Sequence, residues 1–293
     1  MSEHLIKLLI VVMSWLPLPL ARGLGWLVGE VAWRRKTRGA VTTLINLDLC
    51  LPEFTASERR ALARRSLQQW GMTLFETPIV WRRGLKALGL IRAVNGQPLM
   101  DAALADDRGL ILLSPHLGNW ELTGLWLSRQ GPTTILYQPP RQAKLEELVK
   151  AGRGKAGAKL VPTDLRGVSA LIKALKRGEV TGILPDMEPD RSGGIFARFF
   201  GIQALTMTLV HNLQHRGDAR VLLAFARRVP GGFVIEVLEP EKAIYDKDPA
   251  IGVAAMNRLV EQSARMAPEQ YQWEYKRFKQ RPEGEGKLYP KGI

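Results

Sequence analysis

The sequence predicts an α/β protein in which a mostly parallel central sheet is flanked by helices and preceded by an N-terminal hydrophobic membrane-anchoring helix. The chain has 293 residues, of which 46% are hydrophobic, and this is enough for a large domain with its own core. Beyond residue 105, short apolar runs alternate with helical stretches, a pattern typical of strands connected through covering helices. The anchor is expected from an apolar segment at the start of the chain.

That first segment, residues 5–20, is apolar apart from one lysine, one serine and two prolines. A membrane-crossing helix needs about 20 apolar residues, and Arg22 with the two prolines interrupts this stretch. We therefore expect a shallow or tilted anchor within residues 1–38, which end in a basic cluster. Basic residues that follow an inserted segment place the rest of the chain on the cytoplasmic side. A cleaved signal peptide is the alternative, but no clean small-x-small cleavage site follows.

Residues 39–280 are expected to form the α/β domain. A helix beginning near Ser57 is predicted because apolar residues recur there at helical spacing, with arginines on the remaining surface. That basic face is either solvated or a docking surface for a membrane or an acidic protein. The tail, residues 281–293, contains glycine and proline and is expected to be flexible.

The later elements follow from apolar runs and their spacing. Strands are predicted at 109–114, 133–137, 159–161, 180–184, 220–227 and 233–238. Helices are predicted at 119–129, 142–150, 168–177, 205–216 and 251–266. The sequence Pro230-Gly231-Gly232 predicts a hairpin between the last two strands.

Charge and cysteine content restrict the function. Forty-two Lys and Arg against 28 Asp and Glu give a formal charge of +14, which predicts an anionic partner. A nucleic-acid partner is not expected, because no zinc-finger, homeodomain-like or RNP motif is evident. Cys50 is the single cysteine, so an intramolecular disulfide and a cysteine-rich metal site are excluded. His211 and His215 lie four residues apart without a visible third ligand, and neither a metal nor another cofactor is expected.

Two predicted strands end in titratable residues. The strand at 109–114 leads to His116, and the strand at 180–184 leads to Asp186. Ligands of open α/β sheets gather at the carboxyl ends of strands, so these ends are the first candidates for a site.

His116 and Glu121 are five residues apart, with a break between them. If Gly118 makes a tight turn and Asn119 caps the next helix, the two side chains face one another. Glu121 would then orient His116, which would act as a general base. Gly118 and Asn119 are substrate-binding candidates, because N–H groups at the helix start would bind an oxyanion or phosphate. The alternative is an ordinary loop histidine, with Glu121 complementing the helix dipole.

The block His116-Leu117-Gly118-Asn119-Trp120-Glu121 resembles the His-x4-Glu block of the late acyltransferases of lipid A biosynthesis, the lauroyl and myristoyl transferases of Gram-negative inner membranes. The resemblance continues in the same order over about residues 5–280. Its further blocks are Tyr137-Gln138-Pro139, Gly167-Val168 with Leu175-Lys176-Arg177-Gly178, Asp186, Phe199-Phe200-Gly201 with Ala204 and Thr206, and Tyr271-Gln272-Trp273 with Arg277-Phe278-Lys279. The departures are Gln138 in place of arginine, Met187-Glu188 in place of Gln-Asp, and Glu274-Tyr275 within the usual Trp-x-His.

The resemblance implies transfer of a fatty acyl chain from an acyl carrier protein thioester to a hydroxyl of a phosphorylated lipid A precursor at the inner membrane, on its cytoplasmic face. His116 would take the hydroxyl proton and Glu121 would orient it. The departures leave open an acceptor that is another glycolipid, an aminolipid or a glycerolipid. A non-catalytic membrane scaffold of the same fold is a further alternative.

Three further assignments concern the substrates. Arg153, between two glycines, is the candidate for the acceptor phosphate, against a flexible basic loop. Asp186 would orient a cation or sugar hydroxyl, or cap a turn. An acyl groove is assigned to the aromatic residues Phe196, Phe199 and Phe200, for which core packing is the alternative.

Overall fold

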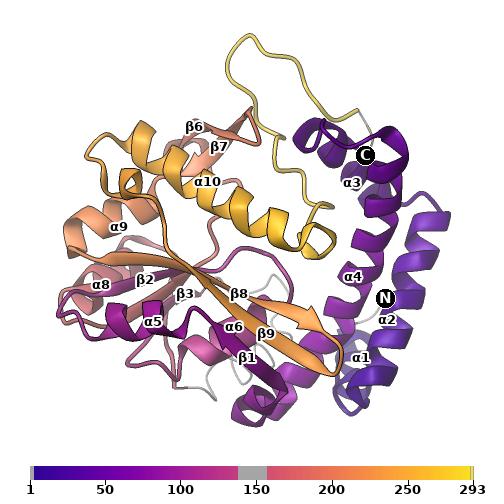
Figure 1. The fold of residues 1–293 in the computed structure, drawn as a ribbon, viewed down its shortest axis with the longest axis horizontal. Helices are drawn as coiled ribbons and strands as arrows, with labels where there is room; N and C mark the ends of the chain where they lie inside the picture. Colours follow the sequence, from indigo (N-terminus) through magenta and orange to yellow (C-terminus); the bar gives the residue numbers. More distant parts are fainter. Residues whose placement is uncertain (1–2, 138–156, 291, 293) are drawn as a thin grey trace.

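The computed structural model describes residues 3–137, 157–290 and 292 (Figure 1). Its centre is a five-stranded sheet in which β8 and β9 are antiparallel and every other neighbouring pair is parallel. The predicted α/β fold with a mostly parallel sheet is therefore confirmed. The strands in spatial order are β1 (Ile91–Asn95), β9 (Gly232–Leu238), β8 (Arg220–Val229), β2 (Leu110–Leu113) and β5 (Val180–Ile183).

Two short strands extend this sheet beyond β5. They are β3 (Thr134–Tyr137) and β4 (Lys159–Pro162), which pair in parallel. A parallel bridge between Thr133 and Val180 attaches β3 to the edge of the main sheet. The strand at this edge thus joins the wall of the site described below.

Helices cover both faces of the sheet, because successive strand residues point to opposite sides. In β2, Ile111 and Leu113 belong to one apolar cluster, and Leu110 and Leu112 to the other. The first face is covered by α8 (Leu165–Leu175), α9 (Leu209–Gly217) and α10 (Pro249–Met266), and the second by α5 (Gln97–Leu104) and α6 (Trp120–Leu127). All four residues of β2 are buried, which explains its unbroken apolar sequence.

The predicted strands are all present, but the helix expected at 205–216 is partly wrong. Its first residues lie in β7 (Ile202–Met207), which pairs with β6 (Gly194–Phe199), and α9 begins only at Leu209. The turn between these strands contains Phe200 at φ 50° and Gly201 at φ 79°, the positive values that a tight hairpin requires. The helix expected at 142–150 lies outside the described residues.

The N-terminal part is a set of helices and not a single anchor. They are α1 (Glu3–Ser14), α2 (Leu18–Arg34), α3 (Arg38–Cys50) and α4 (Ala56–Arg83). Pro17 separates α1 from α2, since its fixed φ suits a helix start and not a helix interior. In the part of the chain that the structure describes, no helix has the length and apolar content needed to cross a membrane. The expected anchoring helix is therefore not found.

Helix α2 lies alongside the long helix α4 (Figure 1). Small residues allow the two backbones to approach closely: a Cβ on Gly29 would lie 2.1 Å from the carbonyl oxygen of Leu67, and one on Gly71 would lie 2.1 Å from that of Gly25. The start of α4 has a capping box between Thr55 and Glu58. The first two helices are therefore a packed part of the domain.

Four short 3₁₀ turns complete the chain, at Gly84–Leu90, Arg191–Gly193, Lys242–Tyr245 and Pro268–Gln270. The segment expected to be a flexible tail returns to the body of the protein near its end. Tyr289 is buried, its hydroxyl donates to Oδ1 of Asn46 at 2.6 Å, and the same hydroxyl accepts from the amide of Phe278. These bonds tie the segment to α3.

Candidate active site

His116 and Asp186 meet because the strands that precede them are parallel neighbours. Leu113 of β2 lies opposite Ile183 of β5, and each chain continues three residues to the titratable side chain. Nδ1 of His116 lies 2.8 Å from Oδ1 of Asp186, and the backbone amide of His116 donates to Oδ2 at 2.8 Å. Both carboxylate oxygens of Asp186 therefore hold His116.

The surroundings keep Asp186 charged. Burial alone would raise the pKa of Asp186, but the charge of His116 and the hydrogen bonds from its ring and amide outweigh this and lower that pKa below its ordinary value. An ionised Asp186 stabilises the tautomer with the proton on Nδ1, which leaves Nε2 to accept another proton. Burial, with the nearby charge of Asp186, raises the pKa of Tyr271 well above its ordinary value, so this phenol stays neutral.

Glu121 lies in the first turn of α6, as the sequence predicts, and lines the same cavity as His116. Its Oε2 accepts a hydrogen bond from the indole nitrogen of Trp81 at 2.9 Å. The carboxylate on Nδ1 of His116, however, is that of Asp186, to which the sequence assigned substrate binding. The structure thus gives Asp186 the orienting position that was expected for Glu121.

Gly118 and Asn119 shape the loop and do not present free amides to a substrate. Gly118 has φ 62°, and a Cβ there would lie 2.1 Å from the carbonyl oxygen of Ala226. Its amide donates to the carbonyl of Gln270, and the amide of Asn119 donates to Ala226. The side chain of Asn119 caps α6 by accepting from Leu122. Their substrate-binding assignment is therefore corrected, because these groups are consumed by internal hydrogen bonds.

A largely apolar cavity of about 480 Å³ opens beside His116. Its polar lining residues are Ser114, His116, Glu121, Thr123 and Thr163, and its apolar lining includes Val80, Trp81, Leu112, Trp120, Leu125, Leu127, Ile135, Leu136, Ile183, Leu184, Met207 and Leu209. Gly124 also lines it, and among the described residues no atom lies within 4 Å of a Cβ placed there. The shape and lining suit a hydrocarbon chain.

The three aromatic residues expected to form an acyl groove lie elsewhere. Among the described residues, Phe196, Phe199 and Phe200 are absent from the lining of this cavity. Phe199 is 1% exposed and its ring lies 4.9 Å from that of Phe200, which in turn packs on Trp273. Their groove assignment is corrected, since β6 and β7 direct these rings into the core beneath α10. The other assigned residue, Arg153, lies outside the described residues.

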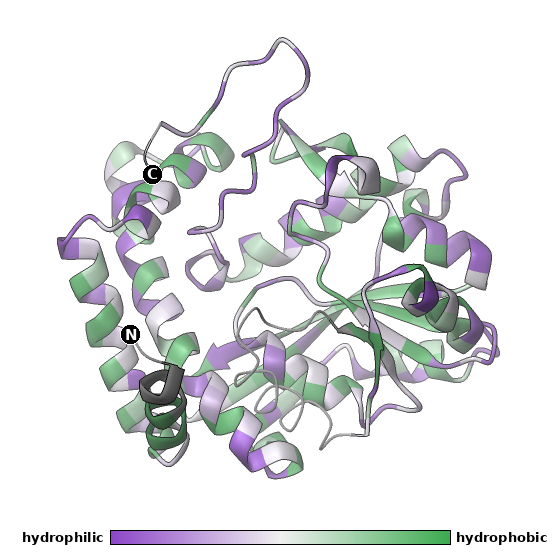
Figure 2. Ribbon diagram, turned by 180° about the vertical axis from the view of Figure 1, so that it is seen from behind, coloured by the Kyte–Doolittle hydropathy of each residue, from purple (hydrophilic) through white to green (hydrophobic). Residues whose placement is uncertain are grey.

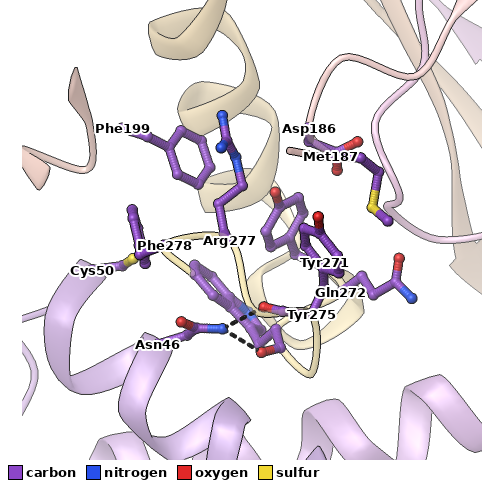
Figure 3. A pocket seen from close by; sticks show the side chains of 11 residues that line it. Asn46, Cys50, Asp186, Met187, Phe199, Tyr271, Gln272, Tyr275, Arg277 and Phe278 are labelled. Carbon is purple, nitrogen blue, oxygen red and sulfur yellow. Dashed lines mark hydrogen bonds between the residues drawn. The ribbon is translucent and has the colours of Figure 1, made fainter. Parts of the chain in front are cut away.

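Figure 3 shows the packed region between these aromatic rings and Asp186. The space there is about 10 Å³, too small for a substrate. Asn46 of α3 donates to the backbone carbonyls of Trp273 and Tyr275 at 2.7 and 2.8 Å. This fixes the C-terminal segment, and the amide of Gln272 donates in turn to the carbonyl of His116. The catalytic loop is thereby held from the side of the C-terminal segment.

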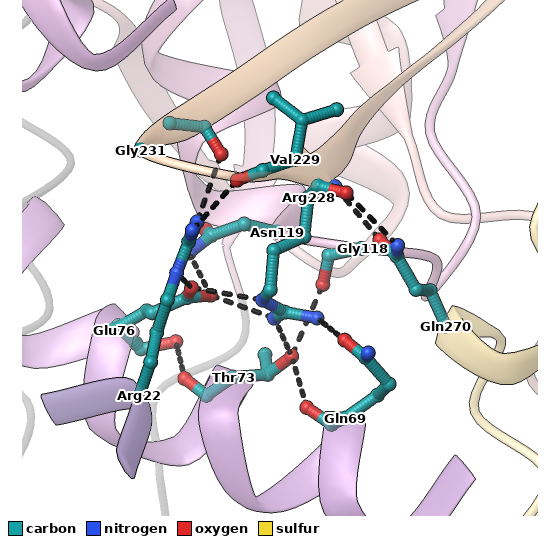
Figure 4. A network of polar contacts seen from close by, with 12 residues as sticks. Arg22, Gln69, Thr73, Glu76, Gly118, Asn119, Arg228, Val229, Gly231 and Gln270 are labelled. Atoms are coloured by element: carbon teal, nitrogen blue, oxygen red, sulfur yellow. Dashed lines mark hydrogen bonds and ion pairs between the residues drawn. The ribbon is translucent and has the colours of Figure 1, made fainter. Parts of the chain in front are cut away.

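A buried ion cluster holds the loop from the other side (Figure 4). Glu76 of α4 is fully buried between two guanidinium groups. Its Oε1 accepts from Nε of Arg22 at 2.6 Å, and its two oxygens accept from Nε and Nη2 of Arg228 at 2.8 and 2.6 Å. Arg22 also donates to the carbonyls of Val229 and Gly232. We call Arg22, Glu76 and Arg228 the Glu76 cluster.

The Glu76 cluster contacts the loop that carries His116. Nη2 of Arg228 donates to the hydroxyl of Thr73 at 2.7 Å, and this hydroxyl donates to the carbonyl of Gly118 at 3.3 Å. Nδ2 of Asn119 lies 3.5 Å from Oε2 of Glu76. Helices α2 and α4, strand β8 and the catalytic loop are therefore joined by one set of charges. The sequence gave no local signal of this set, whose members are far apart in the chain.

An imidazole held by a carboxylate at the mouth of an apolar cavity is suited to removing a proton beside a bound hydrocarbon chain, as an acyltransferase requires. A family model described as bacterial lipid A biosynthesis acyltransferase matches residues 3–280. The chain is 32% identical over 272 residues to the lipid A biosynthesis lauroyltransferase of Escherichia coli K12, with 92% of this chain and 88% of that one covered. The chain therefore belongs to the family of bacterial lipid A biosynthesis acyltransferases.

Two further relatives define the range of similar proteins. The lipid A biosynthesis palmitoleoyltransferase of Escherichia coli K12 is 29% identical over 277 residues, which cover 94% of this chain and 90% of that one. A phosphatidylinositol mannoside acyltransferase of Mycobacterium tuberculosis H37Rv is 29% identical over 143 residues, or 46% of this chain. The resemblance to the lipid A acyltransferases seen in the sequence is confirmed.

Replacing Asp186 tests which carboxylate orients His116. Asp186→Asn keeps the size of the side chain but removes the charge that holds Nδ1–H, so acyltransferase turnover should fall about 10²- to 10⁴-fold. Glu121→Gln leaves this contact intact and should cost less. Turnover and melting temperature of both variants are the measurements. Wild-type turnover in Asp186→Asn with a severe loss in Glu121→Gln would return the orienting role to Glu121.

Removing the charge of Glu76 should destabilise the whole domain. Glu76→Gln leaves two buried guanidinium groups without their counter-ion, and the free energy of unfolding should fall by about 3–5 kcal/mol in urea titrations. The matched control is Glu53→Gln, which breaks an exposed pair with Arg265 and should change it by less than about 1 kcal/mol. Similar small changes in both variants would refute a central role for the Glu76 cluster.

Proposed function

We propose that this protein transfers a fatty acyl chain from an acyl carrier protein thioester to a hydroxyl of a lipid A precursor, a phosphorylated and acylated glucosamine disaccharide. The observation that carries the proposal is the His116–Asp186 pair at the mouth of the 480 Å³ cavity. The lauroyltransferase and palmitoleoyltransferase relatives support an acyl donor and a lipid acceptor of this class. The formal charge of +14 suits both an acidic carrier protein and a phosphorylated lipid.

In the proposed reaction, Nε2 of His116 takes the proton of the acceptor hydroxyl while its oxygen attacks the thioester carbonyl. A C–O bond forms, the C–S bond breaks, and the proton passes from His116 to the departing thiolate. The charge of Asp186 stabilises the imidazolium in between. The first amides of α6, at Trp120 and Glu121, are the proposed donors to the developing oxyanion. Glu121 remains a predicted catalytic residue at the same cavity.

We also propose that the α1–α2 hairpin rests on the cytoplasmic face of the bacterial inner membrane. Figure 2 shows apolar residues along these helices, and many are exposed: Leu8, Leu9, Val11, Val12, Trp15, Leu20, Leu24, Trp26, Leu27, Val28 and Val31. An exposed apolar face of this extent is typical of contact with a lipid surface. Basic residues at 34–38 follow it and would attract anionic lipids.

A second candidate acceptor is another glycolipid. The partial match to a phosphatidylinositol mannoside acyltransferase favours this alternative over an aminolipid or a glycerolipid. The same His116 chemistry would apply, because only the hydroxyl-bearing headgroup changes.

The function is tested by incubating purified protein with acyl carrier protein thioesters and the phosphorylated glucosamine disaccharide lipid in detergent micelles. Mass spectrometry of the lipid should show the mass of one added acyl chain. His116→Ala should reduce this product about 10²- to 10⁴-fold while the protein stays folded, because the general base is removed. An acylated product at wild-type rate in His116→Ala would contradict the mechanism. Acylation of phosphatidylinositol mannoside alone would select the second acceptor.

The cavity should set acyl chain length through Gly124. A side chain at this position would project into open space within the cavity, so Gly124→Ala, Gly124→Val and Gly124→Leu should exclude progressively more of the chain. Transfer of the longest accepted chain should fall about 10- to 200-fold for each methylene displaced. Gly89→Leu, outside the cavity lining, is the control for added bulk. An unchanged chain-length profile in Gly124→Leu would place the acyl chain elsewhere.

A further inference from the structure

A second cavity, of about 400 Å³, lies where α2, α3 and α4 meet the segment after Trp273. Its lining shares no residue with the cavity beside His116. The lining residues are Ala32, Thr37, Arg38, Gly39, Leu67, Trp70 and Glu274. The wall is thus apolar and aromatic, with one guanidinium and one carboxyl group.

Glu274 is the unusual member of this lining. Both carboxylate oxygens are buried, and neither has a hydrogen-bond partner among the residues that the structure describes. Burial raises the pKa of Glu274 to about 7, and its own backbone, Gln272 and the charge of His116 offset only part of this rise. Buried polar groups without a partner are rare in native proteins and call for an explanation such as a bound ligand.

The carboxyl group of Glu274 is also held in place. Asn46 donates to the carbonyls of the residues on either side, Trp273 and Tyr275, and the indole nitrogen of Trp273 donates to the carbonyl of Pro268 at 2.7 Å. The backbone around Glu274 is therefore fixed by tertiary contacts. A fixed acceptor that lines a cavity is suited to a ligand that donates hydrogen bonds.

The charges around the cavity select the type of ligand. Arg38 lines it, and Arg35 and Lys36 are exposed in the preceding turn, so a cationic ligand is disfavoured and an anionic group is favoured. The start of α3, a helix of 13 residues, adds its positive dipole end. Trp70 offers a ring face of the kind that packs against the C–H groups of a sugar. An aromatic ring, a carboxyl acceptor and a guanidinium together fit a phosphorylated sugar.

The position of the cavity relates it to both the active site and the exposed hairpin. Trp70 and Trp81 line the two cavities and are eleven residues apart on α4, or about 16 Å along the helix axis. Gln272, two residues before Glu274, donates its amide to the carbonyl of His116 at 3.0 Å. Val31, the last exposed apolar residue of α2, precedes Ala32 of the cavity wall. A lipid with a sugar phosphate headgroup would therefore lie with its chains along α2 and its headgroup here.

We propose that this second cavity binds a phosphorylated sugar unit of the lipid acceptor, with Glu274 accepting from sugar hydroxyls, Trp70 packing on the ring and Arg38 binding phosphate. The proposal rests on the function proposed above, because it supplies the acceptor for the hydroxyl attack at His116. It places one end of a long acceptor at the cavity and lets the reacting hydroxyl reach the catalytic loop.

The test compares Glu274→Gln, Trp70→Leu and Arg38→Gln with Arg198→Gln, an exposed cation on β6 that serves as the matched control. The probe is the phosphorylated glucosamine disaccharide lipid in nonionic detergent micelles. Each of the three variants should raise the acceptor KM and the directly measured Kd at least about tenfold. Slow hydrolysis of the acyl thioester by water should be unchanged, because it uses His116 without an acceptor. Melting temperatures establish that the variants are folded.

A second arm uses soluble glucosamine 1-phosphate in the same binding assay. Weaker binding of both the lipid and the soluble sugar phosphate in the three variants supports a headgroup site. Weaker binding of the lipid alone would assign the cavity to a hydrocarbon chain and overturn the proposal, as would wild-type KM and Kd in all three. If wild-type protein does not acylate this lipid at all, the proposed function fails, while the binding measurements still decide the cavity.

Discussion

The buried charge of Glu76 is the constraint on which the arrangement of this protein depends. A carboxylate that is fully buried between Arg22 and Arg228 is tolerable only when both guanidinium groups are in place, because an uncompensated buried charge is strongly unfavourable. One guanidinium comes from α2 and the other from β8. The helical hairpin, the sheet and the long helix α4 must therefore assemble together.

The same requirement reaches the chemistry. Thr73 and Asn119 connect the Glu76 cluster to the loop after β2, and the segment at 270–272 holds that loop from the other side. His116 is thus carried by backbone that has little freedom, and the bidentate contact with Asp186 fixes its ring. A general base needs this kind of positional control, since proton transfer depends on hydrogen-bond geometry.

The surface divides into regions of different chemistry along one side of the molecule. An apolar face on α1 and α2 leads to basic residues at 34–38, then to the cavity that contains Glu274. The hydrocarbon cavity beside His116 lies further along α4. Hydrophobic burial provides no preferred orientation by itself, whereas charges and fixed acceptors do. The two cavities therefore suit the two parts of an amphipathic substrate, its chain and its polar headgroup.

The sequence by itself determined the α/β class, the six strands it predicted, His116 and the family, because these depend on local periodicity and on residues close together in the chain. Even the meeting of His116 with Asp186 was accessible, since each follows a neighbouring parallel strand by the same three residues. The tertiary structure decided that Asp186 and not Glu121 contacts Nδ1, that Phe199 and Phe200 pack in the core, and that Arg22 pairs with Glu76. It also decided that α2 packs on α4 through glycines, where an apolar sequence suggested an anchor. These outcomes depend on contacts between residues 50 to 200 positions apart, and local patterns carry no information about which distant charge or backbone will be the partner.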